Sequence, residues 1–394
     1  MIWLILFFCS AFFSLYSVAG YLMILRILVA VRIQKSIAKM AVAGDTLPTV
    51  TLIIPAYNES AVLDEKLRNS LEIDYPAGCL EILVASDGST DQTNEIARRF
   101  TDRGIRLLDF PINRGKSSTL NDAVAKSTGE ILCLCDANVM FQCDALKILV
   151  SHLNDPTIGA VTGDVRLQNE ISDFNAGESL YYRIERQIQI LESALGSTIC
   201  VDGGMYVVRR DLFLPLPADT LLDDFKTSMN VINASQRLLY DQTAIATESG
   251  TPSAEEEFRR RVRLAAGAAQ SVLRRDFPSP TRVFPFFSWV SHKFVRWVSP
   301  CWLVLLLVSN LFLWNEDWMF RVVLFGQLAF YASSVVAWLI PATRTVRPLR
   351  VSFYFVLSQV AMLRGVIQGL FLKQSGVWRR TARAPSCGSK APGD

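Results

Sequence analysis

Two oxygen-bearing side chains stand two positions apart in the middle of the chain, at Asp136 and Asn138. They follow the apolar run 131–135, which is too short for a buried helix and predicts a buried strand. A buried strand that ends in a carboxylate places it at the carboxyl edge of a sheet, where open α/β sheets bind ligands. Two such side chains can bind one hard cation, which would in turn hold phosphate oxygens. An Asx turn after a strand is the alternative explanation for this pair.

The elements around this pair predict the fold class. Short apolar runs alternate with helical segments of about ten residues, which is typical of a doubly wound α/β fold with a parallel sheet. The expected strands are 50–54 (ended by Pro55), 80–85, 105–110 and 131–135, and the expected helices are 60–71, one that ends near Phe100 and one that follows Gly115. Acidic residues, Asp87 and Asp136, follow two of the strands. No Gly-x-Gly-x-x-Gly follows the first strand, which argues against a dinucleotide cofactor.

Composition places the chain between soluble and membrane proteins. Its 394 residues are 51% hydrophobic with a mean hydropathy of +0.27, too apolar for an ordinary soluble protein, yet the middle of the chain is well charged. The net charge is only +3, and no basic patch is interleaved with aromatic residues. We therefore expect no nucleic-acid partner.

The first 31 residues predict a transmembrane anchor. Residues 2–31 are almost entirely apolar and long enough to span a bilayer with tilt. Ala41-Val-Ala43 resembles a signal-peptide cleavage site, but the apolar stretch is too long for a signal peptide and no charge precedes it. Basic residues cluster after the stretch, at Arg26, Arg32, Lys35 and Lys39. They predict that the N-terminus is outside and that the domain at 48–254 is cytosolic.

The C-terminal part returns to membrane character. Residues 255–298 predict a basic helix followed by an amphipathic, aromatic-rich helix that lies in the headgroup region. A transmembrane region is expected at 299–372, and a basic tail at 373–394. Its candidate spans are 300–314, 319–340 and 351–372. Arg364 interrupts the last one and both of its flanks favour the cytosol, so a crossing and a re-entrant or interfacial helix both remain open.

Six segments together resemble the family 2 glycosyltransferases, inverting enzymes with a GT-A-type α/β fold that binds nucleotide-diphospho-sugars. They are Pro48-Thr-Val-Thr-Leu-Ile-Ile-Pro-Ala-Tyr-Asn-Glu59, Val84-Ala-Ser-Asp-Gly-Ser-Thr-Asp91, Asn113-Arg-Gly-Lys116, Cys135-Asp-Ala-Asn138, and the pair formed by Val201-Asp-Gly-Gly-Met-Tyr-Val-Val-Arg-Arg210 with Leu221-Leu-Asp-Asp-Phe225. The resemblance covers about 48–270, and the plan of the membrane tail is similar to that of the polysaccharide-synthase branch.

The resemblance implies a role for each matching residue. These roles are nucleoside binding by Glu59 and Asp87, phosphate binding by Lys116, binding of Mg²⁺ or Mn²⁺ by Asp136 with Asn138, acceptor binding at Gly203 and Gly204, and general-base catalysis by Asp224. Each also has a structural explanation: helix capping for the acidic residues, a surface lysine, and a tight glycine turn. In particular, Asp223 and Asp224 could simply cap a helix that starts at Phe225.

Two departures from the family pattern affect the expectations. Asn138 stands where the family usually has Asp, so we expect weaker metal binding by the protein or a larger share from phosphate oxygens. Processive synthases carry Gln-x-x-Arg-Trp on an interfacial helix, but here the segment reads Glu257-Phe-Arg-Arg-Arg-Val-Arg263. Its arginines, Arg260 among them, could neutralise the diphosphate leaving group or bind anionic headgroups. Processive and single addition both remain open.

These observations predict a multi-pass enzyme of the inner (plasma) membrane. It would transfer a sugar from a nucleotide-diphospho-sugar to a polysaccharide or lipid-linked acceptor. A UDP-sugar is the first candidate for the donor. The alternative is a catalytically idle subunit that binds sugar nucleotides or acts as a scaffold in a synthase complex, with other subunits as partners. Turnover of any sugar nucleotide separates the two.

Overall fold

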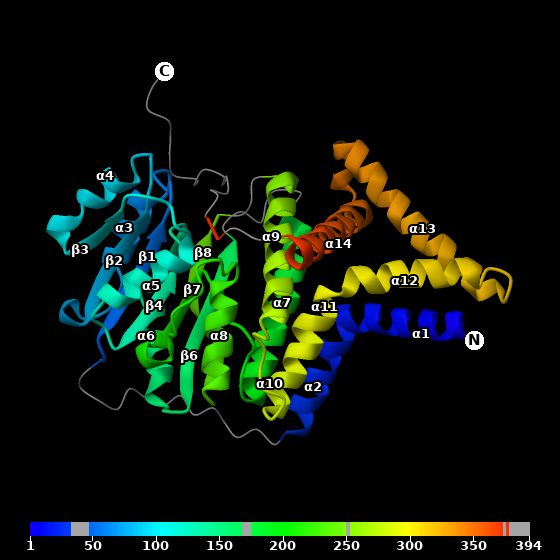
Figure 1. The fold of residues 1–394 in the computed structure, drawn as a ribbon, viewed down its shortest axis with the longest axis horizontal. Helices are drawn as coiled ribbons and strands as arrows, with labels where there is room; N and C mark the ends of the chain where they lie inside the picture. The colour runs from blue at the N-terminus through cyan, green and yellow to red at the C-terminus, as the bar shows by residue number, and fades with distance from the viewer. Residues whose placement is uncertain (33–46, 168–174, 250–252, 373–375, 378–394) are drawn as a thin grey trace.

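The computed structural model describes residues 1–32, 47–167, 175–249, 253–372 and 376–377. An α/β domain lies on the left of Figure 1 and a group of long apolar helices lies on the right, with helices α7 (Asn175–Leu195) and α9 (Ala254–Leu273) between them. Lys35, Lys39, the cleavage-like Ala41–Ala43 and nearly all of the predicted basic tail lie outside the described residues.

Eight strands form one sheet in the order β3-β2-β1-β4-β7-β6-β8-β5 among the described residues. Their bounds are β1 Val50–Ala56, β2 Leu80–Asp87, β3 Ile105–Phe110, β4 Ile131–Cys135, β5 Val139–Phe141, β6 Ile158–Leu167, β7 Met205–Arg209 and β8 Arg237–Glu248. The four expected strands are all present. However, β1 does not end at Pro55 as predicted, because its pairing with β2 continues to Ala56 while its pairing with β4 ends at Ile53.

The sheet is mixed rather than wholly parallel, so that part of the prediction was wrong. Strands β3, β2, β1 and β4 are parallel, as expected for the doubly wound half. Strand β7 runs antiparallel to both β4 and β6, and β5 runs antiparallel to β8. The regular strand–helix alternation that supported the prediction ends at residue 135, and beyond it the chain no longer forms simple parallel crossovers.

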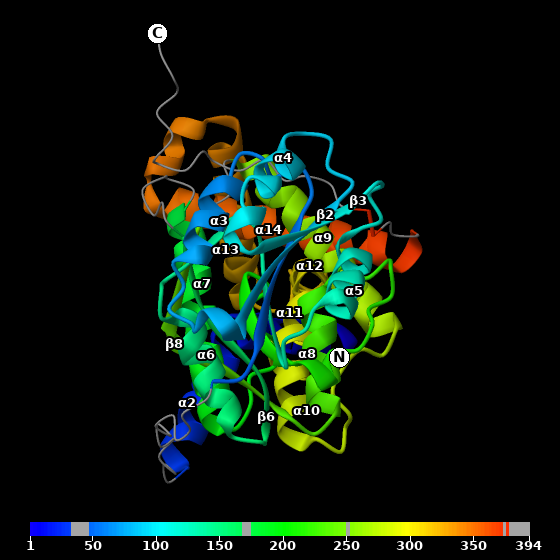
Figure 2. The ribbon, with the colours of Figure 1, turned by 90° about the vertical axis from the view of Figure 1, so that its left-hand side faces the viewer.

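Helices cover both faces of the sheet, as Figure 2 shows, and the strands are therefore buried on both sides. Alternate residues of β1 enter two cores: Leu52 and Ile54 pack on one face, and Ile53 on the other. The covering helices are α3 (Leu63–Leu71), α4 (Thr93–Arg98) and α6 (Ala145–Ser151) on the first face, and α5 (Lys116–Lys126) and α8 (Asp223–Asn233) on the second. Continuous apolar runs, rather than alternating ones, follow from this double burial.

Three helical segments are long and apolar enough to cross a membrane, or four if a bent pair counts as one span, among the residues described. The first is Ile2–Val31, which contains α1 (Ile2–Leu15) and α2 (Tyr21–Val31). A π-helical turn at Tyr16–Gly20 joins them, and Figure 1 shows a change of direction there. The other two are α13 (Trp318–Leu339) and α14 (Arg347–Phe371).

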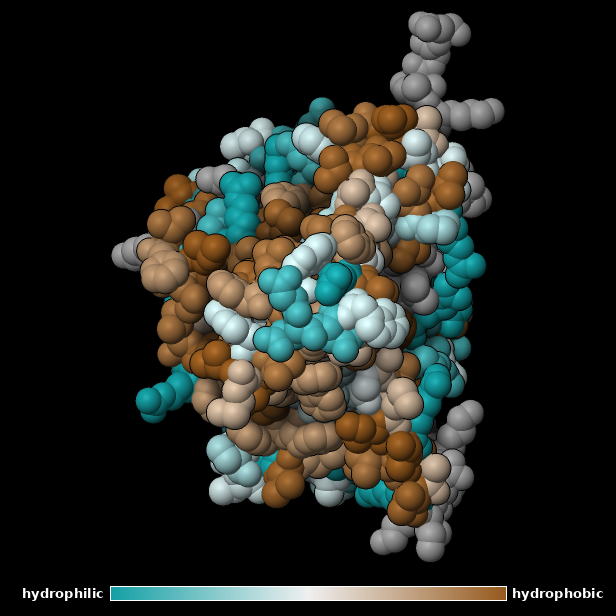
Figure 3. Space-filling model, turned by 90° about the vertical axis from the view of Figure 1, so that its right-hand side faces the viewer, coloured by the Kyte–Doolittle hydropathy of each residue, from teal (hydrophilic) through white to brown (hydrophobic). Residues whose placement is uncertain are grey.

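The bent pair contains the segment expected to lie in the headgroup region. The helical stretch Val283–Trp297 (α10 Val283–Ser288, a π-helical turn and α11 Val295–Trp297) meets α12 (Ser299–Phe312) at an angle of 59°. Figure 3 shows that apolar side chains cover much of the side of the molecule where these helices lie. Large exposed apolar residues on α1 and α13 include Phe8, Phe12, Val322, Phe325 and Trp338. An exposed apolar surface of this kind is typical of contact with lipid.

Helix α14, whose membrane crossing the sequence left open, packs closely along α9, which borders the α/β domain. A Cβ atom on Gly365 would lie only 2.3 Å from the carbonyl oxygen of Val262, so the two backbones approach to a distance that only glycine permits. Arg261 of α9 also stacks over the ring of Tyr354 at 4.8 Å. The last helix therefore connects the apolar region directly to the α/β domain.

Candidate functional site

The Lys116 ammonium lies at the centre of the candidate site. Its Nζ is 3.0 Å from Oδ1 of Asp136 and 3.2 Å from Oδ2 of Asp223. Burial alone would lower the pKa of Lys116, but the negative charges of Asp136, Asp223 and Asp224 outweigh that effect and raise it. The lysine is therefore a fixed positive charge that joins the end of β4 to the start of α8.

The turn before α5 explains why Lys116 points this way. The buried carboxylate of Asp87, at the end of β2, accepts hydrogen bonds from the backbone amides of Arg114 at 3.0 Å and Gly115 at 2.8 Å. These contacts fix the residues that directly precede Lys116. Asp87 thus has a positioning role for the phosphate-binding candidate, and its predicted contact with a nucleoside stays a prediction.

Glu59 lies in a neighbouring turn, beside the start of α4. It is largely buried, and its backbone amide donates to Oγ1 of Thr93 at 2.8 Å. Thr93 in turn donates to the Asp91 carboxylate, which also accepts from the amide of Ser60. Although burial works in the opposite direction, the hydrogen bonds from Thr93 and Ser60 lower the pKa of Asp91. The segments 48–59 and 84–91 are therefore joined by hydrogen bonds into one turn structure next to β2.

Asp136 directly follows β4, as the sequence predicted. Asn138 lies two residues further and is nearly buried, yet its Oδ1 accepts no hydrogen bond. A buried amide oxygen without a donor is unfavourable by itself and is well suited to a cation. The described residues contain no group of three His, Cys, Asp or Glu side chains that could hold a metal by themselves. Any cation here would thus depend on other ligands in addition to Asp136 and Asn138.

Asp223 and Asp224 form the first turn of α8, which begins at Asp223 rather than at Phe225. Both carboxylates are favoured there by the helix dipole. Asp224 contacts the acceptor candidate Gly203: a Cβ atom added to Gly203 would lie 3.0 Å from Oδ2 of Asp224. The next residue, Gly204, donates its backbone amide to Oδ1 of Asp202 at 2.9 Å. The structure therefore brings the segments 201–210 and 221–225 into contact.

Two carboxyls in this region have unusual proton affinities. Burial, and then the charge of Asp223, raises the pKa of Asp224 to about 6. Burial, and then the charge of Glu248, raises the pKa of Asp202 to about 6 as well. A carboxylate with a pKa near the working pH is a better proton acceptor than an ordinary aspartate. Sequence reasoning did not single out Asp202, although its place directly before Gly203-Gly204 was a signal.

A cavity of about 220 Å³ opens beside Asp224. Asp202, Gly203 and Asp224 line one side of it, and Arg260 from α9 lines another. Arg260 contacts the buried Glu257 at 3.2 Å and the hydroxyl of Tyr182 on α7 at 3.1 Å. The predicted base Asp224, Gly203 and Arg260 therefore share one cavity, whereas Lys116 and Asp136 are not among the residues that line it.

A buried ionic network beside this cavity was not predicted. The ring of His292 lies between Glu185 and Glu192 of α7, with N···O distances of 2.8 and 3.0 Å. Only an imidazolium can donate to both carboxylates. Burial alone would raise the pKa of Glu185, but the positive charges of His292, Lys293 and Arg296 lower it well below its usual range. Because Tyr21 of α2 donates to Glu192 at 2.7 Å, the network ties the first apolar helix to α7.

The described residues that follow α14 return to the turn before Lys116. A Cβ atom on Gly115 would lie 2.2 Å from the carbonyl oxygen of Gly376, and one on Gly376 would lie 2.2 Å from the carbonyl oxygen of Ala218. Gly376 is therefore packed between the turn before Lys116 and the segment that leads to α8. This contact joins the C-terminal part of the chain to the candidate site.

Residues 51–214 match the model of the family described as Glycosyl transferase family 2. The matched segment is therefore a family 2 glycosyltransferase domain. Of the predicted site residues, those from Glu59 to Gly204 lie inside the match, and Asp224 and Arg260 lie beyond it.

Two curated relatives point the same way. The chain is 29% identical over 267 residues to the Probable glycosyltransferase YdaM of Bacillus subtilis, and the alignment covers 61% of this chain and 60% of that protein. It is 26% identical over 272 residues to the Poly-beta-1,6-N-acetyl-D-glucosamine synthase of Staphylococcus aureus, covering 67% of this chain and 65% of the relative. The chain thus spans somewhat less than two thirds of the curated relatives it matches.

The fold resembles that of a solved mannosyltransferase over nearly its whole length. The mannosyltransferase PcManGT from Pyrobaculum calidifontis, in complex with GDP-Man and Mn²⁺, superposes with a TM-score of 0.72. The match covers 94% of this chain and 100% of that one at 22% sequence identity. The α/β domain therefore has the GT-A-type fold that the sequence predicted, with a mixed sheet.

Proposed function

We propose that the protein is a membrane-bound, inverting glycosyltransferase. It transfers a sugar from a nucleotide-diphospho-sugar to a polysaccharide or lipid-linked acceptor, and a UDP-sugar is the first candidate for the donor. The observation that carries this proposal is the arrangement around Lys116, whose ammonium joins Asp136 on one side to Asp223-Asp224 on the other. A donor diphosphate next to Lys116 and Asp136 would place its sugar towards Asp224 and the cavity beyond it.

The residues at the end of β4 fit a divalent cation, Mg²⁺ or Mn²⁺. Asp136 supplies a carboxylate and Asn138 a buried amide oxygen without a hydrogen-bond donor. Oxygen ligands of this kind are those that these cations prefer, and the donor phosphates would complete the ligand set. The bound cation would neutralise charge on the diphosphate as it leaves. The Mn²⁺ in the mannosyltransferase complex from Pyrobaculum calidifontis supports this expectation.

Asp224 is the proposed general base. The acceptor hydroxyl attacks the anomeric carbon from the face opposite the diphosphate, and Asp224 takes the hydroxyl proton as the new bond forms. The bond between the anomeric carbon and the diphosphate oxygen breaks, and Lys116 holds the departing phosphate by charge. The pKa of about 6 leaves Asp224 ionised at neutral pH while keeping it a better base than an exposed aspartate. Asp223 holds Lys116, and Arg260 lines the acceptor side.

The apolar helices support attachment to the inner (plasma) membrane. Three or four of them are able to cross a bilayer by length and composition. Because basic residues follow the first span, we place the N-terminus outside and the α/β domain in the cytosol, where sugar nucleotides are found. The poly-β-1,6-N-acetyl-D-glucosamine synthase relatives support a role in cell-envelope or exopolysaccharide synthesis.

The test is a screen of the detergent-purified full chain for nucleotide release. A panel of UDP- and GDP-sugars is offered with Mg²⁺ or Mn²⁺, and Asp224→Asn serves as the catalytically impaired control. Release of one nucleotide by the unmodified chain, and its loss in the variant, supports the proposal. Binding of sugar nucleotides without turnover of any of them supports the idle-subunit alternative.

A further inference from the structure

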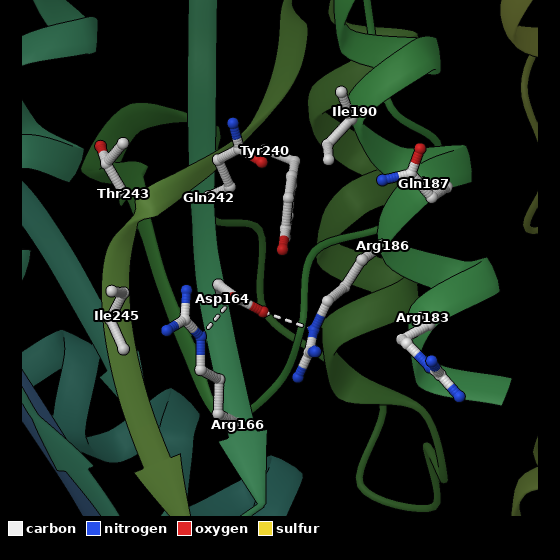
Figure 4. A pocket seen from close by; sticks show the side chains of 10 residues that line it. All are labelled: Asp164, Arg166, Arg183, Arg186, Gln187, Ile190, Tyr240, Gln242, Thr243 and Ile245. Carbon is white, nitrogen blue, oxygen red and sulfur yellow. Dashed lines mark hydrogen bonds and ion pairs between the residues drawn. The ribbon is translucent and has the colours of Figure 1, made fainter. Parts of the chain in front are cut away.

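A second, larger cavity of about 580 Å³ lies between the sheet and α7. Figure 4 shows its lining: β6 contributes Asp164 and Arg166, α7 contributes Arg183 and Arg186, and β8 contributes Tyr240. Two of its arginines, Arg166 and Arg186, share the one carboxylate of Asp164. None of these residues belongs to the motifs that the family resemblance rests on. The lining has an excess of positive charge, so the cavity favours an anion.

The single carboxylate orients two of the arginines rather than neutralising the cavity. Asp164 is buried, and each of its oxygens contacts the Nε of a different arginine: Arg186 at 2.6 Å and Arg166 at 2.7 Å. Arg186 also donates through one terminal nitrogen to the carbonyl of Val165. A guanidinium held at Nε keeps its terminal N–H donors for a second partner. The two guanidiniums are therefore fixed in place with donors still available.

Tyr240 adds a further donor to the same cavity. Its side chain is 92% buried, and its hydroxyl lies near the Asp164 carboxylate without making a hydrogen bond of normal geometry. Burial, and then the negative charge of Asp164, raise the pKa of Tyr240, so the phenol keeps its proton. A buried hydroxyl without a hydrogen bond is unfavourable unless something else accepts from it. Figure 4 shows the hydroxyl directed towards Asp164, whose carboxylate lies between Arg166 and Arg186.

The cavity shares wall residues with the one that contains the proposed base. Asp164, Arg186 and Tyr240 line both cavities, and Asp224 and Gly203 line the smaller one. A ligand held among the arginines would therefore lie next to the cavity that contains Asp224. The wall formed by α7 is also the helix that binds Tyr21 of the first apolar segment. A molecule anchored in a membrane beside α2 would thus have its polar end close to this cavity.

We propose that the arginine-lined cavity binds a phosphate group of the acceptor, so that the acceptor class is a phosphate-bearing molecule. A phosphate offers three strong acceptor oxygens, whereas a carboxylate offers two. The donors here come from two strands and a helix on different sides, which matches a tetrahedral oxyanion better than a planar one. This inference rests on the proposed function, because it assigns the acceptor to the same catalytic site. The phosphate belongs either to a lipid carrier or to a water-soluble sugar phosphate.

The test measures equilibrium binding to the detergent-purified full chain. The probes are a polyprenyl monophosphate, the matching polyprenol, a hexose 1-phosphate and a hexuronate oligosaccharide. The variants are Arg166→Gln, which leaves the pair of Asp164 and Arg186 in place, and Arg183→Gln on the opposite wall. Arg166→Lys keeps the charge, and Arg68→Gln, on the exposed surface of α3, is the matched control. Thermal midpoints establish that each variant is folded.

We expect the unmodified chain to bind at least one phosphate probe more tightly than polyprenol. Arg166→Gln and Arg183→Gln should each weaken that binding about tenfold, the usual effect of losing a charge-assisted hydrogen bond, while Arg68→Gln has no effect. Arg166→Lys should recover part of the loss. Tight binding of the lipid phosphate alone identifies a lipid carrier, and equal binding of the hexose phosphate identifies a soluble acceptor.

Three results would overturn the inference: equal binding of polyprenol and polyprenyl phosphate, unchanged phosphate binding in both glutamine variants, or arginine-dependent binding of a hexuronate oligosaccharide in place of phosphates. Nucleotide-sugar turnover is measured on the same samples. Its absence in the unmodified chain refutes the proposed function, whereas the binding measurements still report on the cavity.

Discussion

Replacing the proposed base gives a prediction in which stability and activity change in opposite directions. The pKa of Asp224 is raised from its ordinary 3.8 to about 6. Because the folded state holds the proton more tightly than the unfolded state, stability falls as the pH rises between these values, and the full cost is present above pH 6. A shift of about two units corresponds to about 3 kcal/mol. Asp224 faces a cavity that water can reach, so we expect a smaller net cost of about 1–2 kcal/mol.

Asp224→Asn removes that charge and keeps the side-chain oxygen that accepts from the amide of Phe225. At pH 8 the variant should therefore be more stable than the unmodified chain, with a thermal midpoint higher by roughly 2–6 °C. At pH 4 the two should unfold at nearly the same temperature, since the aspartate is then protonated. Sugar transfer should fall by about 10²–10⁴-fold at pH 8. Transfer by the unmodified chain should rise with pH through about 6.

The assay pairs thermal unfolding in detergent at pH 4 and 8 with a transfer assay and donor-binding measurements. Donor affinity should hardly change, because the base faces the acceptor. Asp223→Asn is the informative comparison: it removes a partner of Lys116, so no stabilisation is expected, and transfer should fall less than in Asp224→Asn. Asp211→Asn, at an exposed position, controls for the loss of one charge. Normal transfer by Asp224→Asn, or a lower midpoint at pH 8, would refute the reasoning.

Three further predictions concern the metal, the topology and helix packing. Asp136→Ala should abolish Mn²⁺- or Mg²⁺-dependent binding of the donor with little change in the thermal midpoint, since the residue follows a strand; unaltered metal-dependent binding would contradict its role. A reporter fused near residue 150 should report the cytosol, and a signal from the opposite side would exclude the proposed topology. Gly365→Leu should lower both the thermal midpoint and transfer, because its side chain would collide with the backbone of α9 at Val262, whereas Gly326→Leu, with open space around it on α13, should be tolerated.

The first half of the α/β domain was predictable because local sequence determines it. The run that becomes β4 has the predicted bounds, Ile131–Cys135, since a short, fully apolar stretch flanked by polar residues is typical of a strand buried on both faces. The position of Asp136 at the carboxyl edge follows directly. The direction of β7 was not predictable in this way, because antiparallel and parallel neighbours place the same demands on a buried strand.

Helix α7 shows a different limit of prediction from the sequence. Its apolar positions Ile184, Ile188, Leu191 and Leu195 recur at helical spacing and pack together, so the helix itself carried a readable signal that sequence reasoning did not use. Its ionic partners carried none. Glu185 and His292 are 107 positions apart, and no local pattern indicates that they meet. The same holds for Asp164 and Arg186, which belong to separate elements on either side of the arginine-lined cavity.

The charge balance around Lys116 links the donor and acceptor halves of the site. One ammonium lies among the carboxylates of Asp136, Asp223 and Asp224, so this region is negative before any donor arrives. A nucleotide-diphospho-sugar is itself an anion and would be repelled unless a cation bound with it. A cation held by Asp136 would repel the Lys116 ammonium, which contacts the same carboxylate at 3.0 Å, and the ammonium could then contact a phosphate oxygen instead. In the proposed enzyme, binding of the cation would therefore be coupled to a movement of the Lys116 side chain from Asp136 to a phosphate of the donor.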